Sequence, residues 1–195
     1  MTHRIVLIQG HPDPDPGHLC HALGRAYAEG AREAGHEITE IAVAFLAFPI
    51  LRNETEYSGP VPEGLQQALE AIQTADHIVI VFPLWLGTLP ALTKAFFEQI
   101  LHRHIAFEDA AGPHGFPRAR LGGRSARLVT TMSMPSLLYR FWYRAHGLKW
   151  FERNALNLAG IAPVRKTLFG GATSVDDTTR AKWLEKMREL GREVY

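Results

Sequence analysis

The first residues that could do chemistry lie in a short loop near the amino terminus. Residues 10–18 read GHPDPDPGH and stand between an apolar run and a segment with helical spacing. A helix N-terminus carries free amide donors and a positive dipole, so this loop could hold a phosphate group. It matches neither GxGxxG nor GxxxxGKS/T, which argues against a standard dinucleotide fingerprint and against a P-loop nucleotidase. A turn stiffened by its prolines explains the same residues equally well.

A second candidate is the apolar segment at residues 82–90, FPLWLGTLP, which ends the most strand-like run in the chain. The carboxyl ends of parallel strands are where ligands bind in doubly wound sheets. A flat aromatic ligand could rest on such a loop, with backbone amides meeting its polar ring edges and apolar side chains excluding water. On these residues alone, a hydrophobic loop packed beneath a later insertion is the more frequent explanation.

The ten histidines raise the alternative of a metal site. The two groups to consider are His102 and His104 with His114, and His11 with His18 and His21. Neither group follows the HExxH spacing, and no acidic residue is well placed to complete a ligand set. We therefore expect no metal.

Nucleophilic side chains offer little further chemistry. There is no GxSxG segment, and Ser133 and Ser136 have no identifiable base partner, which argues against a serine hydrolase. Cys20 stands at the start of an expected helix, where the pKa of a thiol can fall. A partly buried structural thiol is its commoner role.

Composition bounds the class of protein. The 195 residues contain no long polar linker, so we expect one domain over 1–195. Basic and acidic residues number 21 and 20, which leaves no general cationic field for nucleic acid. Cys20 is the only cysteine, so a reducing cytoplasm fits best. No apolar stretch approaches the roughly 20 residues that span a bilayer, and the first residues do not resemble a signal peptide, so no membrane insertion is expected.

Alternating strand and helix patterns would position these residues. Short β-branched or apolar runs predict strands at 4–9, 37–43, 78–82, 126–131 and 164–169. Apolar residues at three- and four-residue spacing predict helices at 19–34, 63–74, 90–103 and 175–195, and residues 136–159 are compatible with a helix. A segment rich in Gly, Pro and His, residues 104–123, forms an insertion that could serve as a lid or a dimer arm. The alternation predicts an α/β doubly wound parallel sheet with helices on both faces.

Four segments together resemble the flavodoxin-like NAD(P)H:quinone oxidoreductases, including the modulator-of-drug-activity and potassium-efflux ancillary types. They are RIVLIQGHPDPDPGHLCHAL, the central VFPLWLGTLPALTKAFFEQIL, Thr130-Thr131, and GIAPVRKTLFG. The resemblance covers nearly the whole chain, and its central block is the most specific part. It implies one flavodoxin-like domain with a five-stranded parallel sheet in the order 2-1-3-4-5, and with insertions around 104–123 and 136–159.

The resemblance also implies a flavin site that holds FMN or FAD. In relatives the His-Pro loop binds the flavin phosphate, a role that falls here to His11, His18, Leu19 and Cys20. The flavin ring would lie along Pro83, Leu84, Trp85, Leu86 and Gly87, and near Thr130, Thr131, Met132 and Ser133. His18 and Cys20 stand where many relatives carry Ser and Asn, and Met132-Ser133 replaces two glycines. We therefore expect fewer phosphate contacts and an altered ring geometry.

The implied activity is that of a flavin-dependent NAD(P)H oxidoreductase, which passes hydride through flavin to a quinone-like or other flat acceptor. In related enzymes a Tyr and a His near the flavin stabilise charge, and Tyr139, Tyr143 and His146 are the candidates here. Aromatic packing on one side of a helix explains their spacing more simply. The family further implies a homodimer. The alternative is a non-catalytic flavodoxin-like regulatory or binding subunit, for example of a transporter.

Overall fold

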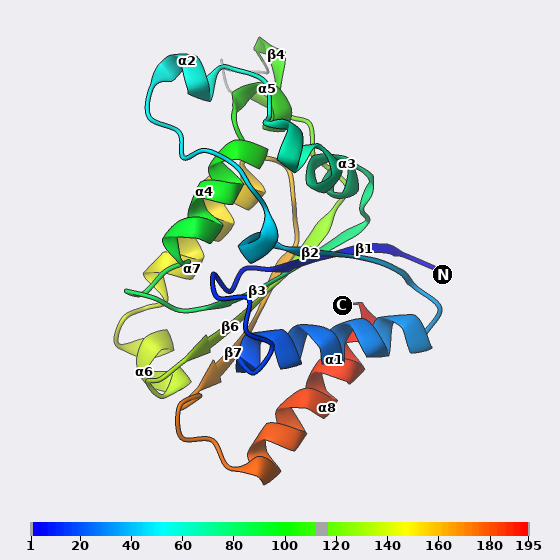
Figure 1. Ribbon diagram of the computed structural model, residues 1–195, viewed down its shortest axis with the longest axis vertical. Helices are drawn as coiled ribbons and strands as arrows, with labels where there is room; N and C mark the ends of the chain where they lie inside the picture. Colours follow the sequence, from blue (N-terminus) through cyan, green and yellow to red (C-terminus); the bar gives the residue numbers. More distant parts are fainter. Residues whose placement is uncertain (1, 112–116, 195) are drawn as a thin grey trace.

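The computed structural model describes residues 2–111 and 117–194, and it contains one five-stranded parallel sheet and one two-stranded hairpin (Figure 1). The sheet has the order β2-β1-β3-β6-β7. Its strands are β1 (Arg4–Gln9), β2 (Glu37–Ala42), β3 (His77–Pro83), β6 (Ser125–Met132) and β7 (Val164–Gly170). Because β4 (Phe107–Ala111) and β5 (Pro117–Ala119) form the separate antiparallel hairpin, the predicted fourth and fifth strands are β6 and β7. The predicted order of the sheet is confirmed.

The helices cover both faces of this sheet, as the alternation predicted. The α-helices are α1 (Leu19–Glu33), α2 (Glu54–Tyr57), α3 (Gln66–Thr74), α4 (Ala91–Ile100), α5 (Arg103–Ala106), α6 (Ser136–Phe141), α7 (His146–Phe151) and α8 (Asp177–Glu193). Two short 3₁₀ turns, η1 (Val43–Phe45) and η2 (Glu63–Leu65), and a π-helical segment, η4 (Glu152–Asn157), complete the elements. In Figure 1 the blue α1 and the red α8 lie on one side of the sheet, and α3, α4 and α7 lie on the other.

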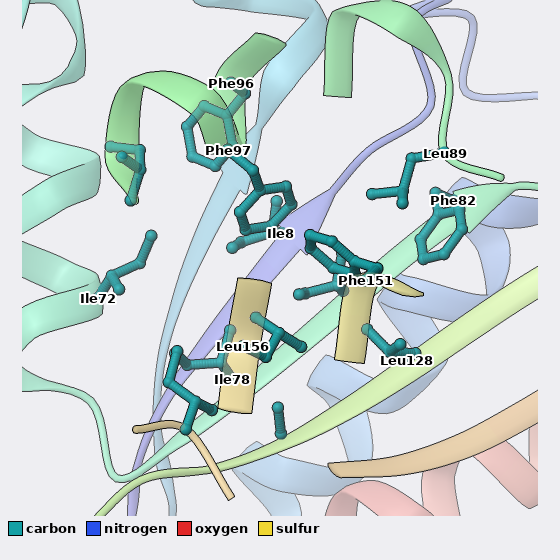
Figure 2. Packing of buried hydrophobic residues seen from close by; sticks show 14 of the residues in the cluster. Ile8, Ile72, Ile78, Phe82, Leu89, Phe96, Phe97, Leu128, Phe151 and Leu156 are labelled. Carbon is teal, nitrogen blue, oxygen red and sulfur yellow. The ribbon is translucent and has the colours of Figure 1, made fainter. Parts of the chain in front are cut away.

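Each face of the sheet has its own core because side chains alternate along every strand. Ile8 and Ile78 belong to the larger cluster, where they pack with Phe96 of α4 and Phe151 of α7 (Figure 2). Leu7, one residue before Ile8, belongs instead to the cluster beneath α1 and α8. All seven residues of β3 are buried, as expected for a central strand covered on both sides.

Helices α1 and α8 approach each other closely at two glycines. A Cβ atom added at Gly30 would lie 2.0 Å from the Arg188 carbonyl oxygen, and one at Gly191 would lie 2.2 Å from that of Tyr27. Ion pairs from Arg188 to Glu29 at 3.0 Å and from Arg192 to Glu33 at 2.9 Å border this contact. Close backbone contact therefore adds to the packing of larger side chains such as Tyr27 and Met187, which lie in the core cluster beneath the two helices.

The expected helical region at 136–159 is broken once, between α6 and α7, and it changes to a π-helix at Glu152. Arg144 (φ 52°) and Ala145 (φ 49°) both adopt the left-handed conformation between α6 and α7, which a continuous helix does not allow. The predicted helix at 90–103 is likewise shorter, since α4 ends at Ile100 and α5 begins at Arg103. These breaks place α6 beside the carboxyl ends of the central strands (Figure 1).

Two sequence expectations fall partly outside the described residues. Residues 112–116 of the expected insertion at 104–123 are among them, and so is His114 of the metal alternative. Among the residues that the structure does describe, no helix is both long enough and apolar enough to cross a lipid bilayer.

Candidate functional site

The loops that follow β1, β3 and β6 meet at the carboxyl edge of the sheet. The Gly10 amide donates to the Val81 carbonyl at 2.7 Å, and the Leu84 amide donates to the Thr131 carbonyl at 2.8 Å. The Cys20 thiol lies 3.2 Å from the Thr131 hydroxyl. Segments separated by about fifty residues or more in sequence are thus joined by direct contacts at the place where ligands bind in such sheets.

The loop after β1, residues 10–18 and here called the His-Pro loop, is shaped mainly by its own side chains. The Asp13 carboxylate accepts from the Asp15 amide and pairs with His18 Nε2, both at 2.9 Å. The Asp15 carboxylate in turn accepts from the Gly17 amide at 2.9 Å. These are Asx-type turns, which Asp favours because its short side chain reaches the backbone two residues on. The hydrogen bond from the Asp15 amide, followed by that from His18, lowers the pKa of Asp13.

Three imidazole rings gather around Asp13. The His11 and His18 rings stack with centroids 4.0 Å apart and an interplanar angle of 21°, and His21 Nε2 donates to the Asp13 carbonyl at 2.9 Å. His11 Nδ1 lies 3.1 Å from both the amide nitrogen and the carbonyl oxygen of Asp13. Burial, followed by the neighbouring His18, lowers the pKa of His11. His11 is therefore held neutral near pH 7, with its Nε2 atom left for another partner.

Helix α1 begins directly behind these rings with an uncapped first turn. The side chain of His18 makes no capping hydrogen bond, and the first turn carries no acid. Among the described residues, the amides of Leu19 and Cys20 have no hydrogen-bond acceptor. This end of the helix therefore has both the free donors and the dipole that attract an anion.

The Cys20 side chain is structural, as the simpler interpretation of the sequence held. It is 2% exposed, and burial raises the pKa of its thiol to about 12. The thiol therefore stays protonated at neutral pH and serves to join α1 to the Thr131 hydroxyl.

The loop after β3 turns tightly at residues 85–88, here called the Trp85 turn. The Trp85 and Thr88 amides each donate to the other residue's carbonyl at 3.0 Å. Leu86 (φ 47°) and Gly87 (φ 81°) occupy the two central positions, where a type I′ turn needs positive φ. Leu86 is fully exposed, nothing lies within 4 Å of a Cβ added at Gly87, and neither residue's amide donates to a described residue. The turn thus offers free amides beside an open apolar surface.

The Trp85 turn is held from outside by α6 and α7. The Tyr139 hydroxyl donates to the Gly87 carbonyl at 2.9 Å, and Tyr139 is 2% exposed. Burial raises the pKa of this phenol, so it remains a donor. A Cβ atom at Gly147 would lie 2.0 Å from the same Gly87 oxygen. The position of the turn therefore depends on residues more than fifty positions away.

The His-Pro loop and the Trp85 turn lie side by side. The His11 and Trp85 rings meet edge to face, with centroids 6.2 Å apart. The site thus combines an anion-attracting end near Leu19 with a flat apolar end near Gly87, on neighbouring strands of one sheet. Such a pairing suits an elongated ligand with a phosphate at one end and a planar ring at the other.

The turn after β6 contributes mainly through Thr131. Thr130 and Met132 are buried, with Met132 in the larger core cluster, whereas Ser133 is exposed. The Thr130 hydroxyl has no hydrogen-bond partner among the described residues. The Met132 side chain therefore points into the core, and direct ring contacts by Thr130, Met132 and Ser133 stay a prediction.

The three predicted catalytic residues separate into different environments. Tyr139 positions the Trp85 turn, and Tyr143 is exposed and its hydroxyl makes no hydrogen bond to a described residue. His146 begins α7 and lines a cavity of about 450 Å³ together with Thr88, Lys94, Gly147 and Trp150. Of the three, His146 is the one whose side chain borders an open space beside the Trp85 turn.

Two residues that hold the site were not predicted from the sequence. The Thr93 hydroxyl in α4 donates to the Gly10 carbonyl, and a Cβ atom at Gly10 would lie 2.8 Å from Thr93 Cγ2. Gly147 likewise serves by its small size. Neither residue carries a local motif, because each acts on a backbone atom of a distant loop.

The histidines of the site do not form a metal centre. Among the side chains that the structure describes, no group of three or more from His, Cys, Asp or Glu is arranged to hold a metal ion. In the His-Pro loop the ring nitrogens of His11, His18 and His21 are instead directed at atoms of Asp13.

Comparison with known proteins gives a consistent result. Residues 3–190 match a family described as having a flavodoxin-like fold. A Haemophilus influenzae protein named as an uncharacterized NAD(P)H oxidoreductase is 29% identical over 203 residues, covering 95% of this chain and 91% of that protein. The NAD(P)H:quinone oxidoreductase from Methanothermobacter marburgensis has a TM-score of 0.81 at 19% identity, covering 100% and 98% of the two chains. An FMN-dependent NADH-azoreductase from Bacillus anthracis, solved in complex with FMN, has a TM-score of 0.76 at 16% identity, covering 99% of each chain. At these identities the structural matches establish a shared fold.

Proposed function

This chain belongs to the family with the flavodoxin-like fold, and on that premise we propose that it is a flavin-dependent NAD(P)H oxidoreductase. It passes hydride from the nicotinamide through the flavin to a quinone-like or other flat acceptor. One observation carries the proposal: the uncapped α1 N-terminus and the Trp85 turn, both with free amides, lie next to each other across the contact of His11 with Trp85. The names of the Haemophilus and Methanothermobacter proteins support the same activity.

The residues present fit a flavin nucleotide at both of its ends. The amides of Leu19 and Cys20 would hold the phosphate, and the neutral His11 ring would border it. The free amides of Leu86 and Gly87 would bind the polar edge of the ring system, and the exposed Leu86 and Trp85 side chains would shield it from water. The FMN in the Bacillus structure supports this choice of ligand. Asp13 and Asp15 lie within the His-Pro loop, and their charges oppose a phosphate.

The bound flavin supplies the hydride chemistry, so the protein needs no prominent acid-base pair. The task of the chain is to position the flavin and to exclude water from it. Tyr139 and Gly147 fix the Gly87 carbonyl, and with it the free amide donors of the turn. Thr93 and the Val81 carbonyl fix Gly10 at the start of the His-Pro loop. The two ends of the flavin site are thereby held at a constant separation.

The cavity beside the Trp85 turn is the best place for a flat acceptor. It has a volume of about 450 Å³ and is bordered by Thr88, His146 and Trp150. The Lys94 ammonium lies over the Trp150 ring, 5.3 Å from its centroid. An aromatic wall with a cation and an imidazole beside it suits an oxygen-bearing ring such as a quinone.

The protein acts as a homodimer in this proposal. Large apolar side chains outside the larger cavity gather on α6 and the turn that follows it, where Leu138, Trp142 and Tyr143 are 45%, 78% and 51% exposed. An exposed patch of this kind marks an interaction site in soluble proteins. Size-exclusion chromatography with light scattering should give twice the chain mass, and a monomer at micromolar concentration contradicts this part of the proposal.

The central experiment is a flavin absorption spectrum followed by anaerobic reduction. The purified chain is incubated with FMN and, separately, with FAD, freed of unbound flavin, and mixed with NADH or NADPH without oxygen. We expect bound flavin that is bleached by the nucleotide and regains its colour on addition of a quinone. No retained flavin after either incubation contradicts the proposal. Flavin that is bound but not reduced favours the alternative of a regulatory or binding subunit.

A further inference from the structure

A second cavity, of about 740 Å³, lies at the free edge of the sheet, bordered by α6, α7, β7 and α8. Its volume is in the range of small-molecule sites. We call it the basic cleft, because five cationic side chains line it: Arg140, Arg144, Lys149, Lys166 and Lys186. They come from four elements and one connection, so the fold brings them together although the sequence does not.

The positive charge of the basic cleft is largely uncompensated. Lys166 pairs with Glu152. Arg140, Arg144, Lys149 and Lys186 form no ion pair with a described acid. The formal net charge of the whole chain is only +1, so this concentration is a local feature. A cleft lined by one sign of charge focuses its field and attracts ligands of the opposite sign.

The walls of the basic cleft are apolar between these charges. Leu137, Phe141 and Leu168 line it, and the Arg140 guanidinium lies over the Phe141 ring, 5.7 Å from its centroid. Guanidinium and aromatic groups together bind planar organic anions as well as phosphates. The chemistry therefore favours an organic phosphate with a ring over inorganic phosphate alone.

Helix α6 connects the basic cleft to the proposed flavin site. Tyr139 of this helix contacts Gly87 of the Trp85 turn, whereas its neighbours Leu137 and Arg140 line the cleft. A helix with its side chains is roughly 10 Å wide, so the two places are separated by about that distance. A single extended ligand can reach from one to the other.

Resting on the proposed function, we propose that the basic cleft binds the phosphate-bearing end of the reduced nicotinamide donor and selects NADPH over NADH. Both donors carry a diphosphate, and NADPH adds a phosphate on the adenosine ribose. The four cations without ion pairs carry more positive charge than the diphosphate of NADH would balance. Their charge matches a diphosphate together with the additional phosphate of NADPH. The apolar wall of Leu137, Phe141 and Leu168 provides the surface for the adenine ring, which both donors share.

The test uses a double variant, Arg140→Gln with Lys186→Gln, which removes one cation from α6 and one from α8. Both side chains are exposed, so the fold should be retained. The control is Lys182→Gln, an exposed lysine of α8 that does not line the basic cleft. Calorimetry measures binding of adenosine 2′,5′-bisphosphate, 5′-AMP and inorganic pyrophosphate to each protein, and steady-state kinetics measures kcat and KM with NADPH and with NADH.

We expect the wild-type protein to bind the bisphosphate more tightly than 5′-AMP or pyrophosphate. In the double variant the Kd for the bisphosphate and the KM for NADPH should rise about tenfold, as for the loss of about 1.4 kcal/mol. The KM for NADH and kcat should change less than about twofold, and Lys182→Gln should behave like the wild type.

Failure of this inference can be told from failure of the proposed function. Equal effects on NADPH and NADH, or equal binding of pyrophosphate and bisphosphate, overturn the choice of NADPH while the oxidoreductase stands. Absence of bisphosphate binding to the wild type overturns the cleft assignment regardless of flavin content. If no flavin is held but the bisphosphate binds and the double variant loses it, the organic-phosphate site stands, and both the oxidoreductase and the selection between donors fall.

Discussion

The His-Pro loop and the Trp85 turn face each other across one site, yet beyond Gly10, which Thr93 and Val81 hold, they are kept in shape by opposite means. Asp13 and Asp15 shape the His-Pro loop through hydrogen bonds to residues within five positions in the chain. The Trp85 turn depends on Tyr139, which lies 52 positions from Gly87 in sequence. A loop that is held by its own residues keeps its shape when other parts of the protein change. A loop that is held by distant residues moves when those residues move. Changes in α6 and α7 should therefore affect the ring end of the site and spare the phosphate end.

The largest effect is expected from Gly147→Ala. The added Cβ would lie 2.0 Å from the Gly87 oxygen, so the Trp85 turn must move. We expect a loss of about 2 kcal/mol of stability and more than a tenfold rise in the flavin Kd. Chemical denaturation and fluorescence titration with FMN measure these changes. The control is Gly122→Ala, where an added Cβ meets nothing within 4 Å. Equal behaviour of the two variants contradicts remote support of the turn.

Tyr139→Phe should have the next largest effect. It removes the hydrogen bond to Gly87 and leaves the packing of the ring intact, so the flavin Kd should rise about threefold to tenfold, for about 1 kcal/mol lost. Tyr143→Phe is the matched control, since its exposed hydroxyl has no partner among the described residues. A fall in kcat without a change in flavin affinity in Tyr139→Phe would instead assign this tyrosine to the chemical step.

Asp13→Ala tests the other half of the comparison. The Asp15 amide and His18 lose their common partner, while removal of the Asp13 charge offsets part of this loss at the phosphate. We therefore expect the flavin Kd to rise by only about twofold to fivefold, as for the loss of a partly exposed pair. Asp13→Asn keeps an acceptor for the Asp15 amide and should lose less. Hydrogen exchange should increase at residues 10–18 and stay constant at 84–88. An equal increase in both segments means that the two loops are not independent.

Of the two loops of the site, acidification should act on the His-Pro loop and not on the Trp85 turn. The pKa of His11 is lowered in the folded loop by burial and by His18, and it returns to about 6.5 when the loop opens. The open loop then binds the proton more readily, so the closed loop loses stability as the pH falls through about 6.5. Hydrogen exchange at pH 7.5 and 5.5, corrected for intrinsic rates, should show this opening at 10–18. His11→Asn should reduce the pH dependence, and an unchanged dependence assigns it to another group.

The smallest effect is expected from Leu86→Asn. Asn tolerates the left-handed conformation better than Leu, and Asn-Gly is the preferred pair for a type I′ turn, so stability should rise by about 0.5–1 kcal/mol. If the Leu86 side chain covers the flavin ring, the flavin Kd should rise at the same time. Ile50→Asn, at another exposed apolar position, provides the control. A gain in stability with unchanged flavin affinity removes Leu86 from the site.

The features that the sequence could predict are those determined by neighbouring residues, and the features that it could not predict depend on residues distant in the chain. The strands were predicted from their own apolar patterns, and the position of the His-Pro loop from its glycines and prolines, because both are local signals. The order of the strands in the sheet was predicted from the family resemblance. The Trp85 turn was located from its apolar residues, but its dependence on Gly147 has no local signal. Tyr139 was chosen for a catalytic role by resemblance, and the structure gives it a positioning role. The basic cleft was missed because its cations span residues 140–186 and resemble an ordinary solvated surface in sequence.

Helix α6 has one consequence that concerns energetic linkage. In this six-residue helix, Tyr139 contacts the Trp85 turn on one side, and Leu137, Arg140 and Phe141 line the basic cleft on the other. A ligand that orders this short helix lowers the ordering cost of the second ligand, and linkage requires the benefit to be reciprocal. Flavin should thus strengthen binding of adenosine 2′,5′-bisphosphate by the same factor by which the bisphosphate strengthens flavin binding. Through this helix, the donor would then bind more tightly to protein that already holds flavin than to protein without it.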